Sequence, residues 1–140
     1  MGKADALDRV AQLLVALAAL VALANGAFML VSPLDWYGFV PTVRFTGPYN
    51  AHFVRDIGAA YLASGLMLGW ALPDLRARRL GAVAGGLWMA VHALIHVYEV
   101  SVGICGPGVF WRDAPGVIGP PLLIAAALLI ARRRVTAERL

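Results

Sequence analysis

Apolar residues fall into four long segments, at about residues 10–31, 51–72, 81–102 and 116–131, which short connections separate. The first segment holds 22 residues. As a helix it would extend about 33 Å, enough to cross the hydrocarbon layer of a bilayer. The pattern predicts an all-α fold in which four transmembrane helices pack as an antiparallel bundle, because the connections are short. We expect residues 1–140 to form a single integral membrane domain.

The composition agrees with a membrane protein. The chain is 61% hydrophobic and only 14% charged, whereas a soluble domain has about 25% charged residues. The net charge is +4, but the basic residues lie at the ends of the apolar segments, which indicates topology and not a nucleic-acid partner. Nine of the 12 Lys and Arg residues lie in the N-terminus, the connection at residues 73–79 and the C-terminal tail. The positive-inside rule therefore predicts a multi-pass protein of the bacterial inner membrane, with both termini in the cytoplasm.

Ionisable residues interrupt the third apolar segment, in its second half. His92, His96 and Glu99 follow one another at spacings of four and three residues. These spacings place the three side chains on one face of a helix. A charged residue inside a membrane span costs roughly 2.5 to 3.5 kcal/mol, so such residues usually face a protein interior or a wet cavity. The stripe therefore predicts a functional site.

The second segment carries two further candidates, His52 and Asp56, which are four residues apart. In an antiparallel bundle they lie at the same end as the stripe on the third segment. Neutral imidazole and carboxylate groups are ligands for divalent transition metals, and facing helices of a bundle build such sites. The predicted metal ligands are His52, Asp56, His92, His96 and Glu99. The predicted ligand-binding residues beside them are Asn50, Arg55 and Tyr61.

Other interpretations of the same residues stay open. A haem bound by His92 or His96 is less favoured, because membrane haems usually take ligands from two helices. Glu99 and Asp56 also fit an ion-pair network with Arg55, which would make the chain an accessory or structural membrane subunit. A third interpretation is an enzyme that uses His and Glu acid–base chemistry on a lipophilic substrate.

Small residues predict where a partner helix docks. Gly65 and Gly69, and likewise Gly81 and Gly85, are pairs four residues apart that permit close approach of a second helix. A homo-oligomer or a larger membrane complex would use them. The chain has a single cysteine, Cys105, so it forms no intrachain disulfide and no CxxC redox pair.

One stretch resembles a known family. The sequences SPLDWYGFVP and TGPYNAHFVRDIGAAYL, within residues 32–62, resemble small four-helix bacterial membrane proteins of the DoxX-like kind, many of which have no assigned function. The resemblance implies the four-helix architecture. DoxX itself is linked to a thiosulfate:quinone oxidoreductase, but no quinone motif is found here and no functional residue is carried over.

Overall fold

The secondary structure of the described residues is entirely helical. This computed structural model describes residues 3–40 and 42–137, and within them it contains six α-helices, one 3₁₀ helix and no strand. The elements are α1 (Lys3–Val31), α2 (Pro33–Phe39), η1 (Val43–Phe45), α3 (Ala51–Trp70), α4 (Leu75–Ser101), α5 (Pro107–Val117) and α6 (Gly119–Ala137). The all-α prediction is confirmed.

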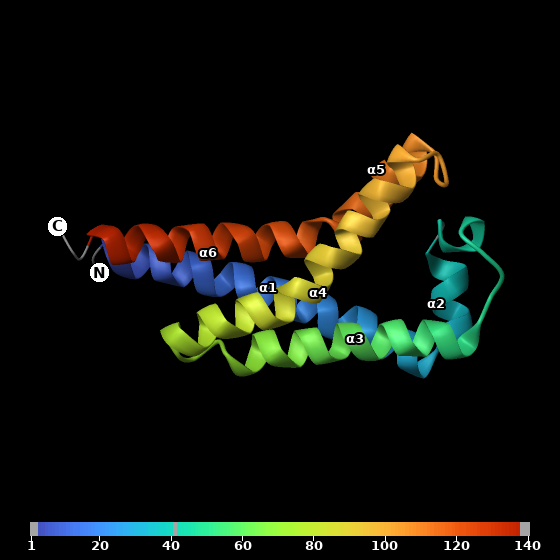
Figure 1. Cartoon of the computed structure of the whole chain (residues 1–140). Helices are drawn as coiled ribbons and strands as arrows, with labels where there is room; N and C mark the ends of the chain where they lie inside the picture. Colours follow the sequence, from blue (N-terminus) through green and yellow to red (C-terminus); the bar gives the residue numbers. More distant parts are fainter. Residues whose placement is uncertain (1–2, 41, 138–140) are drawn as a thin grey trace.

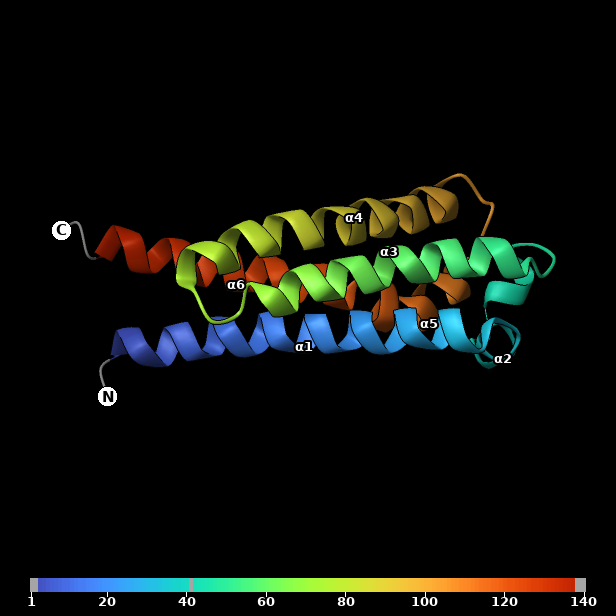
Figure 2. The same cartoon turned by 90° about the horizontal axis from the view of Figure 1, so that it is seen from below.

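The four long helices α1, α3, α4 and α6 lie side by side (Figures 1 and 2). α1 packs most extensively against α3 and α6, and α4 contacts both of them from the other side. α1 and α4 run in one direction, and α3 and α6 run in the other (Figure 1). As a result, α1 begins and α6 ends at the same end of the bundle, while α2, η1 and α5 lie at the opposite end.

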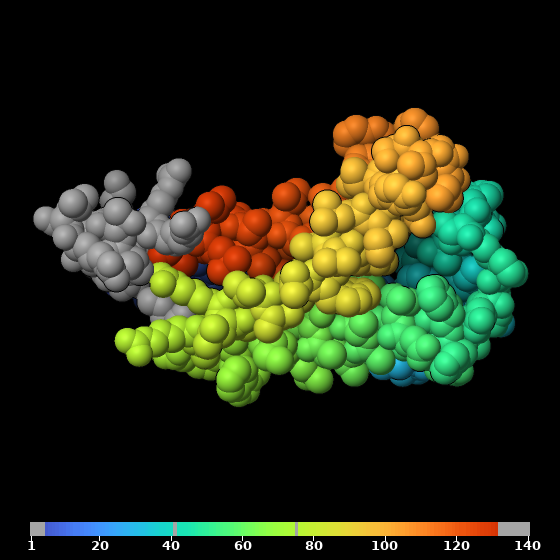
Figure 3. Space-filling view, viewed as in Figure 1, coloured from blue at the N-terminus to red at the C-terminus, as the bar shows by residue number. Residues whose placement is uncertain are grey.

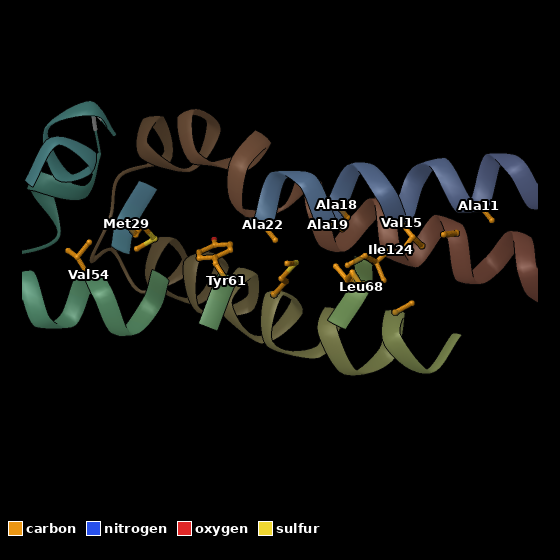
Figure 4. Close-up of a cluster of buried hydrophobic side chains, with 13 residues drawn as sticks. Ala11, Val15, Ala18, Ala19, Ala22, Met29, Val54, Tyr61, Leu68 and Ile124 are labelled. Atoms are coloured by element: carbon orange, nitrogen blue, oxygen red, sulfur yellow. The ribbon is translucent and has the colours of Figure 1, made fainter. Parts of the chain in front are cut away.

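Small side chains line the inner face of α1. Ala11, Val15, Ala18 and Ala22 are buried, at intervals of three or four residues, as expected for one face of a helix. Their small size lets α3 and α6 approach closely. Figure 4 shows the labelled core side chains in the space between these helices, where the core joins Val15, Leu68 and Ile124 from α1, α3 and α6.

Among the described residues, two helices are long and apolar enough to cross a membrane, within Asp5–Val31 and Arg76–Ser101. A third span is added if Pro107–Val117 and Gly119–Ala131, which meet at an angle of 51°, count as one. Only 33% of the apolar stretch in α1 and in α4 is buried within the chain, so large apolar residues on both helices face outward. This surface indicates a membrane protein.

Polar side chains cap the N-termini of α3 and α4. Asn50 Oδ1 accepts hydrogen bonds from the backbone N–H groups of His52 and Phe53, both at 3.1 Å, so the predicted start of the second segment is confirmed. At the other end, α3 stops at Trp70, ahead of the proline at position 73. Asp74 then caps α4 by accepting a hydrogen bond from the backbone N–H of Ala77 at 2.7 Å.

The region from residue 103 onward differs from the expectation. A loop was expected before a regular fourth segment at residues 116–131, but most of that loop is the helix α5, and the helix axis bends before α6. Pro120 and Pro121 explain the bend, because neither has a backbone N–H to continue the helix from the preceding turn. Both prolines instead occupy the first turn of α6, where a missing N–H is tolerated.

Three of the four glycines predicted to receive a partner helix are used within the chain. A Cβ at Gly65 would lie 2.7 Å from Leu23 of α1, and one at Gly81 would clash with Ala71, the residue that follows α3. A Cβ at Gly85 would lie 2.8 Å from the carbonyl oxygen of residue 64, also in α3. Of the four, Gly69 has open space beside it. These glycines therefore explain the close packing of α3 with α1 and α4.

Candidate functional site

A cavity of about 580 Å³ lies at the end of the bundle where α2, η1 and α5 are found. The N-terminal half of α3, the C-terminal half of α4 and the last turns of α1 also contribute to its wall. We call it the end cavity. It exists because α4 leans away from α3 toward its C-terminus and takes α5 with it, as Figure 1 shows. The space-filling view in Figure 3 shows the recess between α4 and α5 on one side and α3 on the other.

Side-chain size explains why α3 and α4 separate. In the first half of α4, Gly81 and Gly85 allow the backbones of the two helices to approach closely. Further along, Trp88 packs edge-on against Tyr61 of α3, with ring centroids 4.7 Å apart. His92 follows, edge-on to the same tyrosine at 5.8 Å. The large rings hold the helices apart at the end where the cavity opens.

The polar wall of the end cavity is centred on Asp113, whose carboxylate contacts two other parts of the chain. The Oδ2 atom of Asp113, on α5, faces Nδ1 of His96, on α4, at 3.9 Å. Its Oδ1 atom accepts a hydrogen bond from the hydroxyl of Thr42, which is buried just before η1. Arg112 and Glu99 line the same cavity. The arrangement offers several hydrogen-bonding groups, of which Asp113 is the shared anchor.

Aromatic rings hold His92 in place. Its imidazole stacks parallel to the indole of Trp88, with centroids 5.1 Å apart and an interplanar angle of 7°. The ring of His96 meets it edge-on at 4.9 Å. His92 is therefore fixed by ring contacts on two sides, and no carboxylate of the described residues pairs with it.

The remaining wall is largely apolar. It includes Val21, Met29, Phe39, Phe53, Val54, Ile57 and Ile95. Two hydrogen bonds hold the segment that closes the end. The indole N–H of Trp36 donates to Oδ1 of Asn25 at 2.9 Å, which fastens α2 to α1. The hydroxyl of Tyr37 donates to the carbonyl oxygen of Gly47 at 2.7 Å. The cavity thus combines one polar wall with a broad apolar lining.

Five of the eight predicted site residues line this cavity: His92, His96, Glu99, Tyr61 and Asn50. The other three lie elsewhere. His52 and Asp56 pair with each other at 3.3 Å between Nε2 and Oδ2, and their side chains are 88% and 60% exposed. Nε of Arg55 donates to the carbonyl oxygen of Leu30 at 3.4 Å.

We expected the second and third segments to share one polar pocket, but His52 and Asp56 of the second segment do not line the cavity. Phe53 and Ile57 line the cavity, and His52 and Asp56 each precede one of them by one position. One position is a rotation of about 100° on a helix, so the His52 and Asp56 stripe faces outward. In the described residues no group of three or more His, Cys, Asp or Glu side chains has a geometry that could hold a metal ion. The five predicted ligands are not brought together, and metal binding stays a prediction.

The sequence interpretation missed Asp113 and Thr42. Both fall in connections between apolar segments, where a polar residue is unremarkable. A signal for Asp113 was its place in a short stretch that has proline at its start and contains Trp111 and Arg112. That stretch is the amphipathic helix α5. Nothing in the sequence around Thr42 distinguishes it from an ordinary loop threonine.

Cys105 lies near the polar wall, in the turn after α4. Its Sγ is 4.0 Å from Oε2 of Glu99. Desolvation raises the pKa of the Cys105 thiol, and the negative charges of Glu99 and Asp113 raise it further. The thiol form is therefore favoured at neutral pH.

Comparison of the chain with protein-family models, with curated proteins and with solved structures finds no match. The resemblance of residues 32–62 to DoxX-like proteins therefore stays a prediction. The end cavity is the feature of the fold that bears on function.

Proposed function

We propose that the protein crosses the bacterial inner membrane four times, through α1, α3, α4 and the bent pair of α5 and α6. The direction of the helices supports this topology. α1 and α4 are the two clearest spans and run the same way, so the chain between them has to return across the bilayer, and α3 is the helix that makes the return. The excess of Lys and Arg at the end opposite to the end cavity supports cytoplasmic termini.

This topology places Cys105 on the periplasmic side, and the single cysteine permits a direct test. A membrane-impermeant maleimide at pH 8 should label Cys105 in intact spheroplasts. Inside-out vesicles should be labelled only after they are permeabilised. The reverse pattern of labelling contradicts the proposed orientation.

The function that the geometry supports best is the binding of a small amphiphilic molecule in the end cavity. The observation that carries this proposal is the distribution of groups around the cavity, with one polar wall at His96 and Asp113 and an apolar lining elsewhere. Binding pockets for small molecules are typically of this size, mostly apolar, with a few placed polar groups. The apolar body of a ligand would lie along the lining, and its polar head would meet the polar wall.

The position of exposed apolar residues supports entry from the bilayer. Phe53 of α3 lines the cavity and is nevertheless 63% exposed, and Ile95 of α4 lines it and is 49% exposed. Both residues thus belong at once to the cavity lining and to the outer surface, so the cavity has an apolar opening to the outside. In a membrane this opening meets lipid, so a lipophilic molecule can enter sideways without crossing the aqueous phase.

A blocking substitution tests the proposal. Ile57→Trp places a large side chain on the cavity-lining face of α3, and Leu66→Trp makes the same kind of change on an outward-facing position of the same helix. We expect wild-type protein and Leu66→Trp in lipid nanodiscs to bind 4-heptylphenol saturably, while Ile57→Trp loses most of this binding. Equal binding by all three proteins, with empty nanodiscs subtracted, would place the ligand outside the end cavity and refute the proposal.

A further inference from the structure

The contact between His96 and Asp113 determines what the imidazole offers to a ligand. The Oδ2 atom of Asp113 lies 3.9 Å from Nδ1 of His96, and the negative charge of the carboxylate favours the tautomer of His96 that carries its hydrogen on this nearer nitrogen. The hydroxyl of Thr42 occupies the other oxygen of Asp113, which holds the carboxylate in this orientation. In the neutral imidazole the other nitrogen, Nε2, is then a hydrogen-bond acceptor.

Hydrogen-bond donors also line the end cavity. Arg112 lines it, and a guanidinium group only donates. Tyr61 is largely buried and lines the cavity, and its hydroxyl makes no hydrogen bond to any other described residue. A ligand head at this wall therefore meets an acceptor, Nε2 of His96, together with donors.

The charge of the wall disfavours an anionic head. Glu99 and Asp113 contribute two negative charges and Arg112 contributes one positive charge among the residues that line the cavity. With both histidines neutral, the sum is one negative charge. A carboxylate or phosphate head would add negative charge to this wall, and it also has no hydrogen to donate to His96.

We infer that the end cavity selects lipophiles with a hydroxyl head, an alcohol or a phenol, whose hydroxyl donates to Nε2 of His96 and accepts from Arg112 or Tyr61. A hydroxyl matches this wall because it has one hydrogen to donate and two lone pairs to accept. An ether can only accept. The inference deepens the proposed function and rests on it, because it assumes that the cavity takes an amphiphile.

Three probes with the same heptylphenyl body and different heads test this inference: 4-heptylphenol, 4-heptylanisole and 4-heptylbenzoate. Their affinities for the full-length protein in phosphatidylcholine nanodiscs are compared per mole fraction of probe in the bilayer, which removes differences in partitioning. We expect the phenol to bind about tenfold more tightly than the anisole, because the ether leaves the half-buried acceptor of His96 without a donor. The benzoate should bind no better than the anisole.

Two variants assign this preference to His96. His96→Phe keeps an aromatic ring and removes the acceptor, so the ratio of phenol to anisole affinity should fall to about one. His52→Phe, the control, removes an exposed histidine that does not line the cavity and should keep the wild-type ratio. A His96→Phe protein that retains the preference would show that His96 does not read the hydroxyl, and the inference would be wrong.

The wild-type measurement alone also separates the inference from the proposed function. Saturable binding of phenol and anisole with equal affinity, or tighter binding of the benzoate, overturns the inference and leaves the proposed function intact. If none of the three probes binds saturably to the wild-type protein, both are overturned.

Discussion

Replacement of Gly26 by alanine tests how closely α1 and α3 pack. A Cβ at position 26 would lie 2.7 Å from the carbonyl oxygen of Gly58 and 2.7 Å from the backbone nitrogen of Leu62. Both atoms belong to the backbone of α3, so no change of a side-chain rotamer relieves the contact. Gly26→Ala therefore forces α1 and α3 apart, and the interface between these two helices is the most extensive one among the described residues.

The expected loss of stability follows from two opposing effects. Overpacking of a close-packed interior costs about 1–3 kcal/mol, and a contact with two backbone atoms favours the upper part of this range. Alanine is the better helix former and returns about 1 kcal/mol. The net change in the free energy of unfolding is a loss of about 1–2 kcal/mol, which for a chain of this length lowers Tm by about 3–8 °C.

Gly69→Ala is the matched control on α3. No atom lies within 4 Å of a Cβ at Gly69, so this substitution keeps the gain in helix propensity and causes no clash. Thermal unfolding in detergent micelles should give a Tm for Gly69→Ala at or slightly above that of the wild type, and a clearly lower Tm for Gly26→Ala. If the two variants were equally stable, α1 and α3 would not pack as closely as described.

Two further predictions concern charged groups. Nη1 of Arg78 pairs with Oδ1 of Asp8 at 2.8 Å, and the side chain of Arg78 is only 7% exposed; Asp8→Asn should therefore lower the free energy of unfolding by about 2–3 kcal/mol. Adding Arg78→Met should restore part of that loss, and additive losses in the double-mutant cycle would show that the two side chains are not coupled. The pKa of Cys105 is raised by desolvation and by nearby carboxylates, so Glu99→Gln should lower this pKa and speed alkylation of the thiol at pH 8. Asp56→Asn, which removes the same charge from the exposed pair, should leave the alkylation rate unchanged, and a faster reaction there would point to a general effect of net charge.

Hydrophobic patterning predicts most of the helices, because it depends on local spacing. The apolar segments overlap α1, α3, α4 and α6 over most of their length, and the second segment begins at Ala51 as predicted. The pattern could not fix the ends of the segments, since α1 and α4 begin several residues earlier with charged residues. It also missed the break at α5, which arises from backbone N–H groups that Pro120 and Pro121 lack.

The candidate site could be predicted only in part. Periodicity correctly places His92, His96 and Glu99 on one face of α4, and that face lines the end cavity. The same reasoning groups His52 with Asp56, and they do pair with each other. Periodicity shows which residues share a face, whereas packing against neighbouring helices decides which face turns inward. On α3 the face that turns toward the end cavity carries apolar and aromatic side chains.

The gradient in side-chain size along α4 connects the fold to the site. At one end glycines bring α4 against α3, and the ion pair between Arg78 and Asp8 fastens α4 to α1. At the other end Trp88 and His92 are too large for such an approach, so α4 diverges and its polar stripe is turned toward α5. Asp113 of α5 meets His96 at this end of α4. Trp88 and His92, which keep α3 and α4 apart, lie about two turns and one turn before His96, which lines the polar wall together with Glu99. The same stretch of α4 therefore both opens the end cavity and supplies its polar groups.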